Sequence, residues 1–105
     1  MTSLVCYESN FVNSHNLHNT WWIDSGSTIH VSTVMQGFQD LRKPSEGELC
    51  VYSGNKMPSA VKGVGTYRLV LHTGYVLNLD KTFYIPSFSK NLVSVSRLAP
   101  QGFDF

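Results

Sequence analysis

The sequence predicts a small all-β domain, on three observations. Short runs of β-branched and aromatic residues recur along the chain. Turn signals rich in Gly, Pro, Asn and Asp separate these runs at regular spacing. The length of 105 residues suits one domain with a modest core. A net charge of +1 with scattered Lys and Arg provides no basic stripe for nucleic acid, so we expect no direct nucleic-acid partner.

The first 19 residues differ in composition from the remainder. They are rich in Asn, Ser and His, which predicts a polar arm or linker (1–19) with room for one short strand, ahead of a folded domain at 20–105. His15 and His18 have a spacing that suits a metal ion, but no Cys or carboxylate pair completes a site. We therefore expect neither a metal nor another cofactor.

Two further features concern the cellular compartment. Cys6 and Cys50 have no CxxC spacing, and we interpret them as two buried thiols in a reducing compartment rather than as a disulfide. No run is long and apolar enough for a membrane span or a signal peptide, so we expect no membrane partner.

The β-propensity runs predict strands in the following order: Thr20–Ile23, Ile29–Ser32, Glu48–Tyr52, Lys56–Val61, Gly63–Leu71, Tyr75–Leu79 and Thr82–Ile85. Asp80-Lys81 predicts a turn between the last two. Gly63 and Gly65 predict a bend or a close backbone approach. Gln36–Lys43 is ambiguous and is interpreted as one helical turn that Pro44 ends.

The third and fourth of these segments contain a hairpin signal. Gly54-Asn55 at its tip supplies residues that adopt the positive φ angles of hairpin turns. Pro58 removes a backbone donor from the return arm, which marks that arm as an edge strand. The hairpin Glu48–Val61 is therefore expected to project rather than to join a central sheet.

The stretch around Asp24 is the main candidate for chemistry. The apolar run Trp21–Ile23 leads directly into this carboxylate, and no other acidic residue lies between Glu8 and Asp40. Ser25, Gly26 and two further hydroxyl residues follow. The Asp-Ser-Gly tripeptide by itself favours plain turn chemistry, in which Asp bonds to its own backbone, over a catalytic acid.

Four sequence blocks, taken in order, favour the catalytic acid over plain turn chemistry. They are Trp22–Ser27 with His30 after it, Gly63–Thr66, Phe83–Pro86, and Asn91–Leu98. Their order and spacing resemble a retropepsin-like aspartic protease, and more narrowly the protease domain of copia-type LTR retrotransposon Gag-Pol polyproteins. Two departures stand out. Ser27 occupies a position where many aspartic proteases have Ala, and Ser94 a position where retroviral members have Gly.

The resemblance implies a fold and an activity. The fold would be a small closed barrel of the retropepsin (acid protease) type with one short C-terminal helix, and the activity an aspartic endopeptidase that processes its polyprotein. That chemistry needs two nearby carboxylates that share one proton. Because the chain has one Asp-Ser-Gly, the second Asp24 would come from a second copy in a C2 homodimer. The expected location is the cytoplasm, within virus-like particles.

The resemblance also implies roles for individual residues. Asp24, Ser25 and Gly26 would be catalytic, with the Ser25 hydroxyl reaching across the axis and Gly26 allowing a close backbone approach. Glu48–Val61 would be a flap over an extended peptide. The substrate-binding residues would be Ser27, Thr28, Tyr52, Ser53, Gly54, Asn55 and Lys56.

Other residues would shape the dimer and the loop. Leu92 and Val93 would pack beneath the Asp24 loop, and Phe103 and Phe105 would join an intersubunit sheet. Within Asn91–Leu98, the spacing of Val95 and Leu98 predicts one face of a short helix, with Asn91 or Ser94 as its cap. His30 stays open between a structural histidine and one that tunes the site. The alternatives are a catalytically inactive retropepsin-fold module for dimerisation or peptide binding, and an unrelated β-barrel adaptor.

Overall fold

In the computed structural model, residues 20–52, 57–71 and 73–98 are described. The chain is mostly β with one short helix, as predicted. Its elements, in order, are β1 (Trp21–Asp24), β2 (His30–Ser32), the 3-10 turn η2 (Glu46–Glu48), β3 (Cys50–Tyr52), β4 (Pro58–Ala60), β5 (Gly63–Val70), β6 (Val76–Tyr84), β7 (Asn91–Ser94) and α1 (Val95–Leu98). The predicted N-terminal arm, the hairpin tip 53–56, Phe103 and Phe105 lie outside the described residues.

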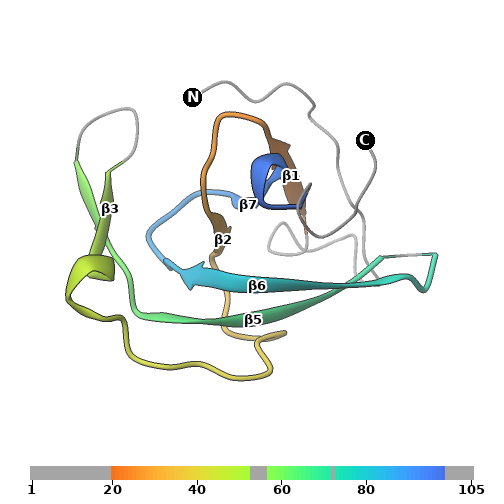
Figure 1. Cartoon of the computed structure of the whole chain (residues 1–105), viewed down its shortest axis with the longest axis horizontal. Helices are drawn as coiled ribbons and strands as arrows, with labels where there is room; N and C mark the ends of the chain where they lie inside the picture. Colours follow the sequence, from red (N-terminus) through yellow and green to blue (C-terminus); the bar gives the residue numbers. More distant parts are fainter. Residues whose placement is uncertain (1–19, 53–56, 72, 99–105) are drawn as a thin grey trace.

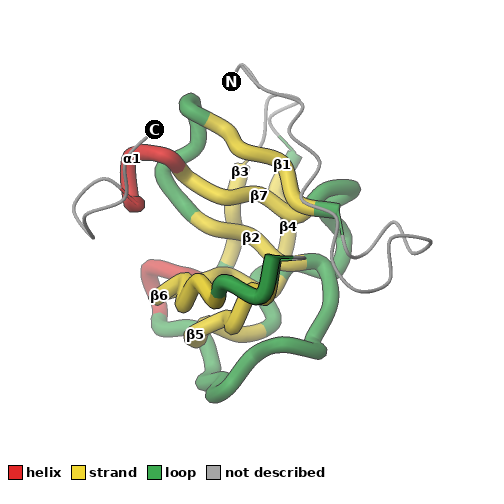
Figure 2. The backbone as a smooth tube through the Cα atoms, turned by 90° about the vertical axis from the view of Figure 1, so that its right-hand side faces the viewer, coloured by secondary structure: helices red, strands yellow, loops and turns green. Residues whose placement is uncertain are grey.

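The main sheet has five strands in the order β1-β7-β2-β6-β5 (Figures 1 and 2). β7 comes last in the chain yet lies between β1 and β2, parallel to the first and antiparallel to the second. The loop that joins β1 to β2 must therefore pass over the C-terminal end of β7. Asp24 is the last residue of β1, so this topology places the Asp24 loop next to the end of β7.

The sheet is not a closed barrel, which corrects that part of the fold prediction. Within residues 20–52, 57–71 and 73–98, β1 and β5 are the two edges of the sheet, and no strand ladder joins them. β3 and β4 form a separate two-stranded sheet, with Tyr52 paired to Pro58. The hairpin thus projects, as its sequence predicts, and Figure 1 shows it set apart from β1. Cys50 on β3 is a free and exposed thiol, so the prediction of a buried one was wrong here.

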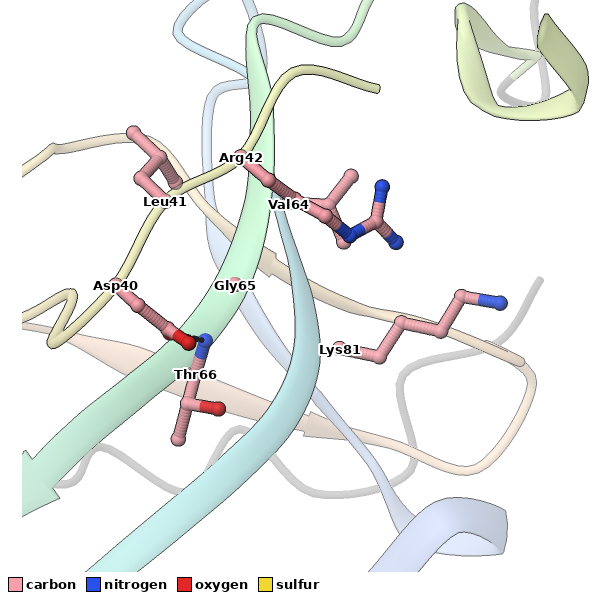
Figure 3. Close-up of a pocket in the computed structure, with 7 residues that line it drawn as sticks. All are labelled: Asp40, Leu41, Arg42, Val64, Gly65, Thr66 and Lys81. Carbon is pink, nitrogen blue, oxygen red and sulfur yellow. Dashed lines mark hydrogen bonds between the residues drawn. The ribbon is translucent and has the colours of Figure 1, made fainter. Parts of the chain in front are cut away.

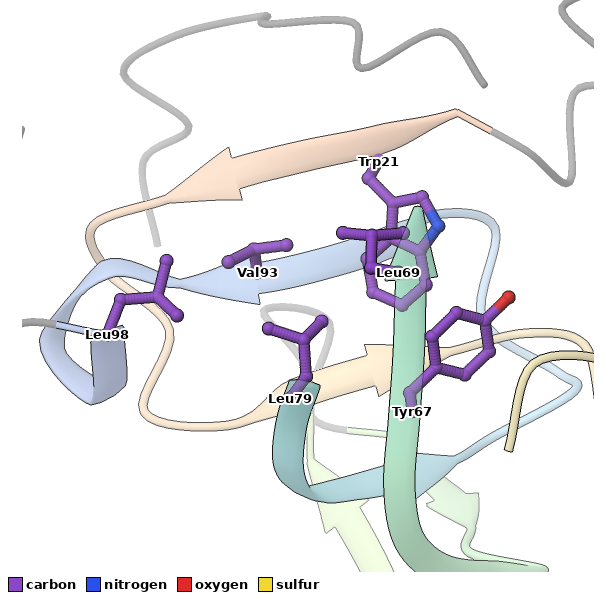
Figure 4. Packing of buried hydrophobic residues seen from close by; sticks show 6 residues of the cluster. All are labelled: Trp21, Tyr67, Leu69, Leu79, Val93 and Leu98. Carbon is purple, nitrogen blue, oxygen red and sulfur yellow. The ribbon is translucent and has the colours of Figure 1, made fainter. Parts of the chain in front are cut away.

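Two apolar clusters form the core, one for each face of the central strands. The first consists of Trp21, Tyr67, Leu69, Leu79, Val93 and Leu98 (Figure 4). The second consists of Val31, Val61, Val64, Phe83, Ile85 and Leu92. Adjacent residues of β7, Leu92 and Val93, point into different clusters, as the two-residue period of a strand requires. β7 is thus buried on both faces.

This burial explains why Asn91–Ser94 is a strand, so that the predicted short helix begins after Ser94, the second of its two candidate caps. Leu92 and Val93 pair with Trp22 and Ile23 of β1 in a parallel ladder. Only Val95–Leu98 is helical, and Leu98 turns back onto the first cluster. Leu92 and Val93 still lie against the strand that carries Asp24, but as strand residues.

The predicted turn at Asp80-Lys81 was also wrong, because β6 runs through it. Lys81 has a φ of 52°, and the register against β5 shifts between Gly65 and Tyr67. The Thr82 hydroxyl donates to the carbonyl of Leu79 at 2.7 Å. A bulge therefore takes the place of the turn, which lets one long strand serve both core clusters.

The segment predicted as a helical turn, Gln36–Lys43, has a turn only at Gln36-Gly37, and from Phe38 onward it runs beside β5. Arg42 and Val64 exchange backbone hydrogen bonds of 2.9 and 3.0 Å. A Cβ at Gly65 would collide with the backbone carbonyl of Asp40. This confirms the close backbone approach that the glycines predict, and it explains why the site requires Gly.

We expect Gly65→Ala to lower the free energy of unfolding by about 1–3 kcal/mol, because the methyl group meets backbone that cannot move alone. Gly47→Ala is the matched control, since no atom lies within 4 Å of its Cβ position, and it should shift stability by less than about 0.5 kcal/mol. Urea denaturation of both variants measures the difference. Equal effects would contradict the packing of Asp40 on β5.

Candidate functional site

Asp24 lies at the end of β1, and none of its surface is exposed in the single chain. One carboxylate oxygen, Oδ1, accepts the Gly26 amide at 2.8 Å. The other, Oδ2, is buried and has no hydrogen-bond partner among the described residues. A buried acceptor left unpaired costs about 1–3 kcal/mol. The carboxylate therefore makes the Asx-type turn that the sequence indicates. Its second oxygen has no hydrogen-bond donor among the described residues.

The loop after Asp24 alternates between exposed and buried residues. Ser25, Gly26 and Thr28 are exposed, which leaves the first two free to face another molecule. Ser27 is buried, and its hydroxyl donates to the Ile29 carbonyl at 2.7 Å and accepts the Ile29 amide at 3.2 Å. The Ser27 side chain is thus committed to the turn, and the hydroxyl holds the second half of the loop in shape.

Ser94 is the residue that fastens this loop to the sheet. It is the register partner of Asp24 in the β1–β7 ladder and is fully buried. Its hydroxyl donates to the Ser27 carbonyl at 2.6 Å and lies 3.0 Å from the Ser96 hydroxyl. Its backbone amide donates to Nδ1 of His30 at 3.0 Å. One residue therefore holds both the middle of the loop and its far end.

His30 is fully buried at the start of β2 and accepts through Nδ1, so its proton sits on Nε2. Nε2 has no partner within the part of the chain that the structure describes. Burial, and to a lesser extent the charge of Arg97, lower the pKa of His30 from 6.5 to about 4. The imidazole is therefore neutral at physiological pH, and its function here is that of an acceptor.

Asn91 performs a similar joining function at the other end of β7. Its side-chain oxygen accepts from the backbone amide and the hydroxyl of Thr33, at 2.7 and 2.8 Å. Its amide group donates to the Thr20 carbonyl at 2.9 Å. The start of β1 and the end of β2 are thus fixed to β7 through one side chain. The sequence indicates Asn91 only as a candidate helix cap, and this joining function is not predicted from it.

The predicted flap is anchored at its base by Glu48. Both of its carboxylate oxygens accept from the Arg42 guanidinium, at 2.7 and 3.0 Å, and the Ser45 amide and hydroxyl add two more bonds. The Arg42 bond, followed by the Ser45 bonds, holds the pKa of Glu48 well below its usual range. Tyr52, at the end of the described part of β3, is 66% exposed. Ser53, Gly54, Asn55 and Lys56 lie outside the described residues.

A cavity of about 370 Å³ opens between β5, Lys81 of β6 and the segment that contains Arg42 (Figure 3). Its lining consists of Asp40, Leu41, Arg42, Val64, Gly65, Thr66 and Lys81. None of the site residues predicted from the sequence belongs to it. This cavity is therefore not the peptide groove that the resemblance implies.

The described residues also bear on metal sites and on membrane-spanning helices. Among residues 20–52, 57–71 and 73–98, no group of three His, Cys, Asp or Glu side chains could hold a metal ion. His15 and His18 lie outside these ranges. In the same part of the chain, no helix has the length and hydropathy needed to cross a membrane.

Comparison with known proteins identifies the family. A family model described as "Pol polyprotein, beta-barrel domain" matches residues 21–103, which is most of the chain. The chain belongs to the family of Pol polyprotein β-barrel domains. In this Pol β-barrel domain, the matched region contains β1 with Asp24, the β3–β4 hairpin and β7 with Ser94.

Two curated relatives are retrotransposon proteins of Arabidopsis thaliana. The domain is 30% identical over 89 residues to the Retrovirus-related Pol polyprotein from transposon RE2, a match that covers 83% of this chain. It is 31% identical over 90 residues to the corresponding polyprotein from transposon RE1, covering 76% of the chain. The Pol β-barrel domain spans only 6% and 5% of the lengths of these relatives. No solved structure matches it.

The burial of His30 predicts a pH dependence of stability. Below pH 6.5 the unfolded chain binds a proton at this residue, whereas the folded chain does not until about pH 4. The free energy of unfolding should therefore fall by roughly 3 kcal/mol as the pH drops from 6.5 to 4 on account of this group.

Urea denaturation at several pH values, with His30→Asn as the reference protein, isolates the contribution of His30 to the free energy of unfolding. The variant keeps an acceptor but does not titrate. The difference in the free energy of unfolding between the wild-type protein and the variant should therefore shrink as the pH falls. Parallel curves for the two proteins would contradict a buried neutral His30.

Proposed function

We propose that this chain is one half of a homodimeric aspartic endopeptidase that processes the retrotransposon polyprotein in which it lies. The observation that carries the proposal is the Asp24 carboxylate: Gly26 holds one oxygen, while the other is buried and unpartnered. A second Asp24 across a C2 axis would supply the missing partner, because two facing carboxyls share one proton. The family match supports the part of the proposal that places the chain in a Pol polyprotein.

The chemistry follows from that pairing. The ionised carboxylate of the pair removes a proton from a water molecule as its oxygen attacks the peptide carbonyl. The protonated carboxyl gives its hydrogen to the carbonyl oxygen, so the pair again holds one proton after the step. The exposed Ser25 would reach the opposite loop, and Gly26 would keep the two loops close.

The flap hairpin would supply substrate contacts. β3 and β4 pair only with each other among the described strands, so their outer edges can bind an extended peptide through backbone hydrogen bonds. The Glu48 contacts with Arg42 and Ser45 fix the base about which such a hairpin would close. The partners would be a second copy and the polyprotein peptide, in the cytoplasm within virus-like particles.

One observation favours a second candidate function. Asp24 has no exposed surface in the single chain, and the cavity beside Arg42 and Gly65 is not lined by it. A catalytically inactive module for dimerisation or peptide binding would need no access to this carboxylate. The endopeptidase, in contrast, requires that dimer formation uncovers Oδ2, so the two candidates differ in whether this oxygen becomes reachable.

We expect Asp24→Asn to abolish peptide cleavage, because an amide can neither share the proton nor accept one from water. The assay is cleavage of a peptide library by purified protein, with mass spectrometry of the products. Asp40→Asn is the control, since its amide oxygen can still accept the Thr66 amide that Asp40 binds at 2.8 Å. Cleavage that survives in Asp24→Asn at the wild-type rate would refute the endopeptidase.

We also expect cleavage to be fastest on the acid side of neutral, because the carboxyl pair must retain one proton. Initial rates from pH 4 to pH 9 on one identified peptide measure this. The Asp40→Asn variant should give the same profile. A rate that rises steadily to alkaline pH would show that the chemistry does not use a carboxyl pair.

A further inference from the structure

The connection between β2 and β7 depends on a side chain rather than on backbone pairing. The ladder between these strands consists of one residue pair, Val31 with Leu92. Beyond that pair, the buried amide of Ser94 still needs an acceptor. The Nδ1 atom of His30 supplies it at 3.0 Å, in the place where a longer ladder would put a carbonyl. Only a side chain with an acceptor at this position can complete the connection.

The same residue, Ser94, is also the attachment point of the Asp24 loop. It is the register partner of Asp24, and its hydroxyl donates to the Ser27 carbonyl at 2.6 Å. His30, Ser94 and Ser27 therefore form one buried chain of hydrogen bonds that spans the loop from its middle to its end. Loss of the first bond frees Ser94 to shift, and a shift of Ser94 moves the loop.

We propose that His30, acting through Ser94, is a positioning residue for the Asp24 carboxyl in peptide hydrolysis. This inference rests on the proposed endopeptidase function. In this proposal, the imidazole touches neither the substrate nor the reacting atoms. It fixes the loop in which the Gly26 amide holds Oδ1 of Asp24, so that Oδ2 keeps the orientation it needs toward the second carboxyl. This answers what the sequence left open: His30 acts on the site through structure.

Two substitutions at His30 separate the acceptor from the ring. His30→Asn keeps an oxygen near the position of Nδ1 but loses volume, whereas His30→Phe keeps a ring of similar size but offers no acceptor. If the acceptor is what matters, His30→Phe should lower kcat by about 10- to 100-fold with KM within about threefold, and His30→Asn should retain most of kcat. Rates are measured per site, counted with a tight-binding statine-type inhibitor.

Thr82→Val is the matched control for lost stability alone. Thr82 is the register partner of His30 on β6 and is fully buried, and its hydroxyl donates to the Leu79 carbonyl at 2.7 Å. Its loss should lower the melting temperature but leave kcat per site unchanged. Equal kcat in His30→Phe and Thr82→Val, or a His30→Asn variant no better than His30→Phe, would overturn the inference.

A measurement independent of activity distinguishes this inference from the endopeptidase proposal. In the wild-type protein, amide hydrogen exchange followed by NMR should show protection of the Gly26 amide, which donates to Asp24. We expect His30→Phe to lose this protection and His30→Asn to keep it. If the wild-type protein cleaves no peptide, the proposed function fails, and Gly26 protection alone decides whether His30 holds the loop. Unchanged protection of the Gly26 amide in His30→Phe would refute the inference that His30 holds the loop.

Discussion

The parallel pairing of β1 with β7 is the constraint on which the rest of the structure depends. It sets Ser94 beside Asp24 and brings the last strand of the chain between the two strands that the Asp24 loop connects. Residues 70 positions apart thereby share one buried environment. Because Leu92 and Val93 point into different core clusters, a slip of one residue would exchange their faces and remove Ser94 from the loop. Core packing and site geometry are thus fixed by the same register.

The buried polar groups around this register are unevenly satisfied, and the pattern is informative. Ser94, Ser27 and Asn91 have their hydrogen bonds within the chain. Oδ2 of Asp24 and Nε2 of His30 have none among the described residues. Each such atom costs about 1–3 kcal/mol, which a natural fold rarely tolerates without a reason. In the proposed dimer, a second carboxyl facing Asp24 would remove this cost.

Much of the strand content could be predicted from the sequence, because local composition determines it. The β-branched and aromatic runs around Trp22, Val31 and Leu69 became strands, and the Pro58 arm became an edge. The errors arose where tertiary contacts decided the outcome. Leu92 and Val93 form a strand because β1 and β2 flank them, and Lys81 continues β6 because a bulge absorbs its positive φ.

The candidate site was predictable to a similar degree. Asp24 and its turn could be identified because the motif is local, and the structure places both at the end of a buried strand. The importance of Ser94 and Asn91 could not be identified from the sequence, since their hydrogen-bond partners lie 58 to 71 residues away along the chain. One signal was present: by the resemblance noted in the sequence, Ser94 occupies a position where retroviral proteases have Gly. A hydroxyl at such a position indicates a partner, which proved to be the Ser27 carbonyl.

The most direct test of the paired carboxylates is the stoichiometry with which a statine-type inhibitor, a mimic of the tetrahedral intermediate, binds the wild-type chain. Isothermal titration calorimetry should give one inhibitor for every two chains, and Asp24→Asn should abolish the binding. A site completed by two copies allows no other ratio. Binding of one inhibitor to each chain, or no binding to a protein shown to be dimeric, would contradict the account.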